Sequence, residues 1–350
     1  MRGRRHGQRD DHRGALSAPR LLSLVPLPEA AVRGLLGELL PRVELVLLPQ
    51  RDGPSLQAAL ADVDLVLASW QGTSPLPFDT AAVEAAGPRL AFVQQPSVGV
   101  DSIDVAALAA RGVPVSNAAG ANAGSVAEWC LGAALAVSRS LLWADAEVRA
   151  GRWPQVEVAQ HGSLEIGGRR VGLLGFGAIG QRCAQAFGGL GASVRYSTRT
   201  RRPAELEHGA VWGELEEVLA ASDVLVVTLP RADGTAGLLD ADRLALLPRG
   251  AVVVSAGRGG VVDEAALLQA VRSGALVGAA LDVYDTEPLP AGDPLRGEER
   301  ILLSPHAAGS SVQGQLQILT ASVTNLRRIL DGEPINNVVN GVDPLVRLRA

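Results

Sequence analysis

Short runs of aliphatic and β-branched residues alternate along this chain with longer stretches in which apolar residues recur at the helical period. Helical patterns such as residues 28–40 and 105–111 separate the first runs. Strands that alternate with helices are typical of βαβ units around a parallel sheet. The runs of the first third are Leu21–Val25, Val43–Leu48, Asp64–Ser69, Leu90–Gln94 and Val113–Ser116.

A second series of apolar runs begins near residue 170. Most of these runs are continuously apolar, as expected for strands that helices cover on both faces. The pattern therefore predicts an α/β protein with two doubly wound parallel-sheet domains. The second runs are Arg170–Gly175, Ser193–Ser197, Asp223–Thr228, Ala251–Ser255, Ala275–Leu281 and Ile301–Ser304.

Two long helical patterns bear on the domain boundaries. One covers residues 125–148, directly after the small-residue segment 120–124, and the other covers 312–330 after the last strand. Either helix could cross between the domains, and if the final helix packs on the first half, that domain is discontinuous. The first twenty residues contain six Arg and no apolar stretch of the kind a signal sequence needs. We expect residues 1–20 to be a disordered basic arm.

Composition narrows the class of protein. The 350 residues suit two domains, 47% of them are hydrophobic, and the net charge of −5 gives no reason to expect a nucleic-acid partner. Every basic side chain is Arg, which excludes Schiff-base lysine chemistry. Cys130 and Cys183 lie far apart and lack metal-binding spacing, so we expect no metal and a reducing, cytoplasmic location. No apolar run approaches the length of a membrane span.

The segment 171–180 has the pattern of a phosphate-binding turn. A strand runs into Gly175, Gly177 and Gly180 in the spacing GxGxxG, and a helical pattern and a second strand follow. The first glycine permits a tight turn, the second lets the backbone approach a pyrophosphate, and the third lets helix and strand pack closely. Free amides at the helix start, Ala178 and Ile179, would face the phosphates. A purely structural glycine turn is the alternative, but this context favours dinucleotide binding.

The second strand of such a unit usually ends in a carboxylate that accepts hydrogen bonds from the adenosine ribose. Here the strand ends without one and continues as a basic loop that could hold a 2′-phosphate, because guanidinium pairs bidentately with phosphate oxygens. We therefore expect NADP (as NADPH) to be preferred and NAD to be accepted, against the alternative of a solvated basic loop. The residues of this loop are Ser197, Thr198, Arg199, Thr200, Arg201 and Arg202.

Three single residues each follow a predicted strand of the second half: Arg258, Glu287 and His306. Ligands of open α/β sheets bind at the carboxyl ends of strands. Arg can anchor a carboxylate and polarise a ketone, His can donate a proton near neutral pH, and a carboxylate beside the His favours its charged form. Singly, each has another explanation: a helix cap, a surface residue before Pro, or a His bonded to a backbone carbonyl.

In this order behind a dinucleotide turn, the three residues resemble those of the D-isomer-specific 2-hydroxyacid dehydrogenases, and the resemblance extends over residues 21–341. It implies that Arg258 binds substrate, that His306 is the acid/base and that Glu287 pairs with it. Segment 97–104 resembles the family's loop whose amides hold the substrate carboxylate, here Val98 and Gly99. The resemblance places further residues against the cofactor: Thr228, Leu229, Pro230, Thr235, Ala256, Gly257, Asp282 and His306 itself.

The resemblance also implies the organisation of the chain. Residues 117–128 resemble the family's crossing segment and first long helix, and that helix would build a homodimer. The substrate domain would be flavodoxin-like and discontinuous, residues 21–121 with 308–345, and a Rossmann domain, 122–307, would bind the dinucleotide. The chain ends about ten residues after the family-like segment 335–340, so we expect it to lack the regulatory tail of many phosphoglycerate dehydrogenases.

Three positions depart from the family pattern: Ser255 replaces the usual Asn, Gly257 a more typical Ala or Ser, and Ser97 a common Gly. These departures leave open the shape of the carboxylate pocket. The resemblance implies that the substrate is a small 2-keto or 2-hydroxy acid, and the basic loop and the chain length favour a glyoxylate/hydroxypyruvate reductase-like activity. Formate and phosphite dehydrogenases share the architecture, and a dinucleotide-sensing corepressor is the alternative that is not an enzyme.

Overall fold

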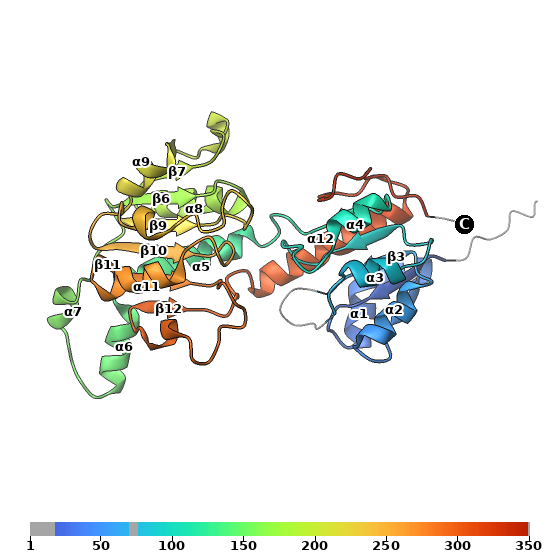
Figure 1. The fold of residues 1–350 in the computed structure, drawn as a ribbon, viewed down its shortest axis with the longest axis horizontal. Coiled ribbons are helices and arrows are strands. Elements are labelled where there is room, and N and C mark those ends of the chain that lie inside the picture. The colour runs from blue at the N-terminus through green and yellow to red at the C-terminus, as the bar shows by residue number, and fades with distance from the viewer. Residues whose placement is uncertain (1–17, 70–75, 349–350) are drawn as a thin grey trace, which may run out of the picture. The chain divides into compact units, whose positions relative to one another are not determined.

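Two parallel sheets organise the described residues, 18–69 and 76–348, in the computed structural model (Figure 1). The chain divides into two compact units. The N-terminal unit comprises the described residues up to Ala119 together with those from Ile318 onward, and the central unit comprises Gly120–Gln317. The predicted basic arm lies largely outside the described residues, and the first strand begins at Arg20.

The N-terminal unit has a five-stranded sheet in the order β2-β1-β3-β4-β5, with every neighbouring pair parallel. This is the strand order of flavodoxin-like sheets. Its elements are β1 (Arg20–Ser23), α1 (Glu29–Leu36), η1 (Gly37–Arg42), β2 (Glu44–Leu47), α2 (Gly53–Leu60), β3 (Leu65–Leu67), α3 (Thr80–Ala85), β4 (Phe92–Gln94), α4 (Val105–Ala110) and β5 (Val115–Ser116).

Local sequence explains where three of these helices begin. Asp52, Asp79 and Asp104 each precede a helix, and each side chain accepts a hydrogen bond from the backbone N–H three residues later. Such a cap satisfies one of the unpaired donors of the first turn and contributes about 1 kcal/mol. The helices cover a sheet whose strands β3 and β4 are buried throughout, as the continuous apolar runs predicted.

The central unit has a seven-stranded sheet in the order β12-β11-β10-β9-β6-β7-β8, a Rossmann order extended by one strand. The prediction of two doubly wound α/β domains is therefore confirmed. The elements are α5 (Ala123–Ser138), α6 (Leu141–Arg149), α7 (Glu157–Gln160), β6 (Arg170–Leu174), α8 (Ala178–Gly189), β7 (Ser193–Ser197), η2 (Ala204–Leu206), β8 (Val211–Trp212), α9 (Leu215–Ala220), β9 (Val224–Val227), α10 (Ala241–Leu244), β10 (Ala251–Ser255), α11 (Glu264–Arg272), β11 (Leu276–Leu281), η3 (Pro294–Gly297), β12 (Ile301–Leu303) and α12 (Val312–Leu330), which continues into the N-terminal unit.

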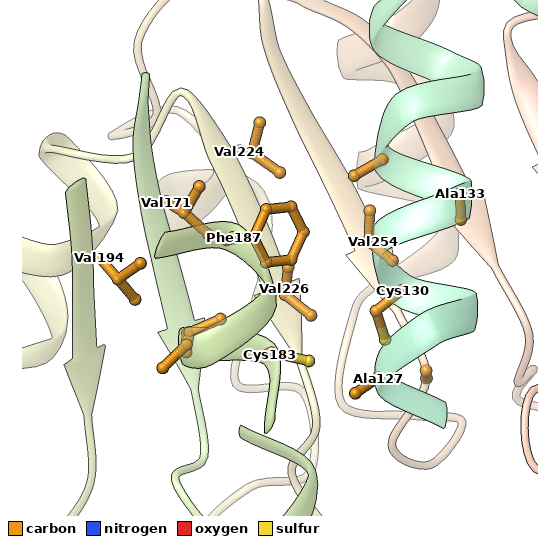
Figure 2. Packing of buried hydrophobic residues seen from close by; sticks show 14 of the residues in the cluster. Ala127, Cys130, Ala133, Val171, Cys183, Phe187, Val194, Val224, Val226 and Val254 are labelled. Atoms are coloured by element: carbon orange, nitrogen blue, oxygen red, sulfur yellow. The ribbon is translucent and has the colours of Figure 1, made fainter. Parts of the chain in front are cut away.

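One face of this sheet packs against α5 and α8. Phe187 of α8 is fully buried and lies beside the valines of β6 and β9, as Figure 2 shows. Full burial of a side chain of this size contributes roughly 1.5–3 kcal/mol. On α5 the buried positions carry small side chains, among them Ala127, Cys130 and Ala133, which let the helix lie close to the sheet. Cys130 and Cys183 are both buried free thiols.

The predicted single helix over residues 125–148 is wrong. The chain forms two helices, α5 and α6, bent by 61° at a break where Ser140 adopts the left-handed conformation with φ 51°. The carbonyl of Ser138 accepts a hydrogen bond from the N–H of Leu164 instead of continuing the helix. Among the described residues no single helix is long and apolar enough to cross a membrane; α5 and α6 meet that criterion only when taken together.

Candidate active site

The turn after β6 has the geometry that its glycines require. Gly175 has φ +93°, a conformation that side chains with a Cβ rarely adopt, and its N–H donates to the carbonyl of Ser197 at 3.2 Å. A Cβ on Gly180 would lie only 2.3 Å from the carbonyl oxygen of Gly175, whereas a Cβ on Gly177 would meet nothing within 4 Å. The backbone is thus open at the second glycine and tightly packed at the third.

Helix α8 begins directly at this turn. Its N-cap is Gly177, and no side chain caps the helix, so its first amides, including those of Ala178 and Ile179, keep no side-chain partner. A helix start of this kind presents N–H groups and the positive end of the helix dipole to an anion. The turn therefore fits a dinucleotide pyrophosphate.

The segment after β9 closes one side of the turn. The hydroxyl of Thr228 lies 3.2 Å from the carbonyl oxygen of Leu174 and 3.3 Å from that of Gly175. The hydroxyl of Thr235 lies 2.6 Å from the carbonyl oxygen of Pro230, which folds the loop back on itself. Leu229, between them, is half-buried.

The basic loop after β7 is anchored by a carboxylate that comes ten residues after the strand. Tyr196 donates to Oε1 of Glu207 at 2.8 Å and accepts from the N–H of Arg202 at 2.9 Å. Arg201 pairs with both oxygens of Glu207, at 2.8 and 3.0 Å. The Arg201 guanidinium, followed by the Tyr196 hydroxyl, holds the pKa of the Glu207 carboxyl below its ordinary value.

The remaining residues of this loop are placed differently. Arg199 is exposed and forms no ion pair with any described residue, and Thr200 is exposed beside it. Thr198 donates to the carbonyl of Thr200 at 2.8 Å, and Arg202 donates to the carbonyl of Phe176 at 3.2 Å. Of the three arginines predicted to meet a 2′-phosphate, Arg199 is thus exposed, Arg201 is ion-paired and Arg202 is tied to the glycine turn.

Arg258 follows β10 on a segment that packs tightly against the loop after β9. A Cβ on Gly257 would lie 2.2 Å from the carbonyl oxygen of Leu229, which explains why Gly stands at this position. Nη1 of Arg258 donates to the carbonyl of Gly257 at 2.9 Å, and the side chain is half-buried. Ala256 and Gly257 are both buried.

The structure joins His306 and Glu287 directly. Nδ1 of His306 lies 2.7 Å from Oε2 of Glu287, while the other carboxylate oxygen accepts from the N–H of Tyr284 at 3.0 Å. No described residue forms a hydrogen bond with Nε2 of His306, and 39% of the side chain is exposed. The ring is therefore oriented through one nitrogen and presents the other to solvent.

The turn that carries His306 rests on Asp282, which is only 2% exposed. Its Oδ1 accepts from the hydroxyl of Ser304 at 2.6 Å and from the N–H of Ala307 at 2.7 Å, and its Oδ2 accepts from the N–H of Ala308 at 2.8 Å. These bonds surround His306, whose φ of 54° lies in the left-handed region. Asp282 thus fixes the backbone of the His turn.

Tyr284 ties the ends of β11 and β12 together. Its hydroxyl accepts from the N–H of Ser304 at 3.1 Å and lies 2.9 Å from the carbonyl oxygen of Ser304 and 3.0 Å from that of Leu281. Burial raises the pKa of this phenol to about 12. Tyr284 was not singled out from the sequence, because only the hydrogen bonds of the fold distinguish it from an ordinary core aromatic.

In the N-terminal unit, the loop after β4 turns its carbonyls toward the protein. The carbonyl of Ser97 accepts from the N–H of Ala118 at 2.9 Å, and that of Val98 accepts from the side chain of Asn117 at 2.6 Å. The N–H groups of Val98 and Gly99 form no hydrogen bond with any described residue. Successive free amides of this kind form concavities that bind anions.

Comparison with known proteins agrees with this geometry. Residues 131–308 match the family model for the NAD binding domain of the D-isomer specific 2-hydroxyacid dehydrogenases. The chain is 36% identical to the glyoxylate reductase of Aeropyrum pernix over 258 residues, 72% of this chain and 77% of that protein. It is 37% identical to the D-3-phosphoglycerate dehydrogenase of Mycobacterium leprae over 293 residues, 83% of this chain but 54% of that protein.

Among solved structures, one similar chain is the NADPH-dependent glyoxylate/hydroxypyruvate reductase of Sinorhizobium meliloti in complex with NADP and malonate. It superposes with a TM-score of 0.78 at 30% identity, covering 95% of this chain and all of that chain. The chain belongs to the D-isomer specific 2-hydroxyacid dehydrogenase family. It is an NAD(P)-dependent dehydrogenase that transfers a hydride between a nicotinamide and a 2-hydroxy or 2-keto acid.

Proposed function

We propose that the chain reduces a small 2-keto acid of the glyoxylate or hydroxypyruvate type, with NADPH preferred and NADH accepted. The observation that carries the proposal is the pair formed by His306 and Glu287 at 2.7 Å, with Nε2 of His306 left for a ligand. The names of two relatives, a glyoxylate reductase and an NADPH-dependent glyoxylate/hydroxypyruvate reductase, support the substrate class.

His306 is the proposed general acid. When bound, the nicotinamide supplies the hydride that reaches the ketone carbon, and negative charge then develops on the ketone oxygen. Protonated His306 gives its Nε2 proton to that oxygen, and Glu287 balances the charge of the imidazolium from the opposite side of the ring. In the oxidative direction His306 takes the same proton from the hydroxyl group.

Arg258 is the proposed anchor of the substrate carboxylate. A guanidinium holds a carboxylate with two parallel N–H bonds and can polarise the adjacent ketone with the same charge. The free amides of Val98 and Gly99 are the proposed second set of donors to the carboxylate. Both groups favour an anionic substrate, because hydrogen bonds to a carboxylate are charge-assisted and stronger than those to a neutral acceptor.

The central unit is the proposed cofactor-binding domain, and the other unit is the proposed substrate domain. The open backbone at Gly177 and the uncapped start of α8 fit a pyrophosphate. Exposed Arg199, with Ser197, Thr198 and Thr200 beside it, fits a 2′-phosphate. Arg201 can bind the phosphate only when its ion pair with Glu207 opens. The proposed remaining contacts are Ala178, Ile179, Thr228, Leu229, Pro230, Thr235, Ala256, Gly257, Asp282 and His306.

We also propose that two copies of the chain associate through the segment between α5 and β6. In Figure 1 helices α6 and α7 project from the sheet of the central unit. Several large apolar side chains of this segment are exposed, as is typical of interaction surfaces, and a homodimer is what the family resemblance implies. The exposed apolar residues are Leu141, Leu142, Val148, Trp153, Val156 and Leu164.

We propose a cytoplasmic location for the protein, and the two free thiols support it.

Initial-rate assays with glyoxylate, hydroxypyruvate and 3-phosphohydroxypyruvate, each with NADPH and NADH, test the proposal. Phosphoglycerate dehydrogenase activity is the second candidate, because relatives of that name align over 83% of the chain. We expect the highest kcat/KM with one of the two unphosphorylated acids and NADPH. A preference for the phosphorylated acid would favour the second candidate, and binding of NADPH without turnover of any acid would contradict the proposal.

A further inference from the structure

Three successive carbonyls are fixed in the loop after β4, and the third is fixed in an unusual way. The hydroxyl of Ser97 donates to the carbonyl of Gly99 at 2.7 Å, in addition to the bonds that hold the carbonyls of Ser97 and Val98. A trans peptide places its C=O and N–H on opposite sides. The Gly99 bond therefore turns the N–H of Val100 outward, and this amide also forms no hydrogen bond with any described residue.

We propose that Ser97 is a positioning residue that adds the Val100 amide, as a third donor, to the proposed carboxylate site of Val98 and Gly99. The inference rests on the proposed function of this loop and adds a role for Ser97. Family members commonly have Gly at this position, and a Gly has no hydroxyl to hold the carbonyl of residue 99. Three amides match the acceptor capacity of a carboxylate better than two, and they bind it in a fixed orientation.

Gln95 sets the direction of this hydrogen-bond chain. It follows β4, is fully buried, and donates from Nε2 to Oγ of Ser97 at 2.8 Å. The single proton of Ser97 goes to Gly99, so its Oγ must accept from Gln95. This arrangement leaves Oε1 of Gln95 without a hydrogen-bond partner among the described residues. The Gln95 amide thus keeps the Ser97 hydroxyl pointed at Gly99.

The arrangement predicts effects of different magnitude when Gln95 is replaced by either of two residues of similar size. In Gln95→Glu the ionised form of the new side chain can only accept, so the Ser97 hydroxyl would donate to it instead of to Gly99, and a negative charge would lie behind the anion site. In Gln95→Met the hydroxyl keeps its bond to Gly99 and loses only its donor. We expect a large rise in KM for the first variant and a small one for the second.

Steady-state kinetics at saturating NADPH test the role of Ser97. Ser97→Ala is expected to raise KM for the keto acid about three- to tenfold, the effect of losing one aligned hydrogen bond, with little change in kcat. Ser97→Thr keeps the hydroxyl, so its KM is expected to stay close to that of the wild type. Ser102→Ala is the matched control, because the Ser102 side chain on the same loop has no hydrogen bond to any described residue. An unchanged KM in Ser97→Ala would overturn the proposal.

Amide resonances measure the third donor without relying on turnover or on the folding of a variant. In ¹⁵N-labelled, deuterated wild-type protein, titration with malonate is expected to shift the amide signals of Val98, Gly99 and Val100 together. A signal of Val100 that stays in place while the other two move would refute the third donor. If these shifts occur but no keto acid is reduced, the proposed function fails and the assignment of the anion site stands.

Discussion

The imidazole of His306 is held between two fixed points: Nδ1 lies 2.7 Å from Oε2 of Glu287, and Asp282 accepts hydrogen bonds from the Ser304 hydroxyl before the residue and from the Ala307 N–H after it. Glu287 is itself oriented by the N–H of Tyr284. The ring, its partner and its backbone are thus each held by separate hydrogen bonds. An acid held in this way needs no reorientation before it donates a proton.

The proposed role of His306 predicts a loss confined to catalysis. His306→Gln is expected to lower kcat about 10²–10⁴-fold, the usual contribution of a positioned general acid, while the Kd for NADPH changes little. Single-turnover kinetics and fluorescence titration of NADPH provide the two measurements. A variant that keeps wild-type kcat would remove His306 from the mechanism.

Glu287→Gln is expected to lower kcat for reduction more than it changes KM for the keto acid. The amide can keep a hydrogen bond at Nδ1 of His306, but it carries no negative charge to balance the imidazolium that donates the proton. The measurement is kcat and KM with saturating NADPH. A variant with wild-type kcat would show that the charge of Glu287 does not contribute to catalysis.

Arg258→Lys is expected to raise KM for the keto acid on the order of tenfold or more and to lower kcat, since a point charge does not reproduce a bidentate hold. Arg272→Lys, on α11, is a suitable control because Arg272 lies outside the proposed site. Binding of NADPH should not change in either variant. Wild-type kinetics in Arg258→Lys would contradict the proposed anchor.

Cofactor preference should depend on Glu207 as well as on the arginines. Arg199→Ala is expected to lower kcat/KM with NADPH about tenfold, the lower end of the range for a charge-assisted hydrogen bond at an exposed site. Arg201→Ala should cost less, because Arg201 is already paired with Glu207. Glu207→Gln should release Arg201 and increase the preference for NADPH. A stronger preference for NADH in Glu207→Gln would mean that the pair positions the loop and does not compete for the phosphate.

Both tyrosines should ionise at a higher pH in the folded protein than in the unfolded chain. Burial raises the pKa of Tyr284 to about 12 and also raises that of Tyr196 above its ordinary value. A neutral phenol is thus favoured by folding, so its contribution to stability is present below pH 10 and is lost as the pH rises toward 12. Absorbance titration of phenolate, with circular dichroism to confirm folding, measures this. Ionisation of Tyr284 near pH 10 in the folded Tyr196→Phe variant would contradict the burial argument.

Patterns of apolar residues were sufficient to predict most of the sheet strands, because strands covered on both faces must be apolar throughout. The strand β8 was missed, since it has two residues, and Val211 is 54% exposed at the sheet edge. The break at Ser140 was also missed. It depends on a bond between Ser138 and Leu164, and the apolar period of the helix continues across it.

The site was predicted to a different extent in its different parts. The pairing of Glu287 with His306 was predicted from residue order and family resemblance, and the geometry agrees with it. The role of Glu207 in the basic loop was not predicted, because the residue lies ten positions beyond β7 and only folding brings it to Arg201. The hydrogen bonds of Ser97 and Gln95 could not be predicted either, since nothing in the sequence shows which partner a neutral amide or a hydroxyl will bind.

The strand order of the central unit separates two tasks in space. Strands β10, β11 and β12, which precede Arg258, Glu287 and His306, lie on one side of the neighbouring pair β6 and β9, and β7 and β8, which flank the basic loop, lie on the other. Substitutions in the basic loop therefore leave the strands that precede the proposed catalytic residues unchanged. The proposed preference for NADPH can on this arrangement be altered, by evolution or by engineering, separately from the proposed catalytic residues in the other half of the sheet.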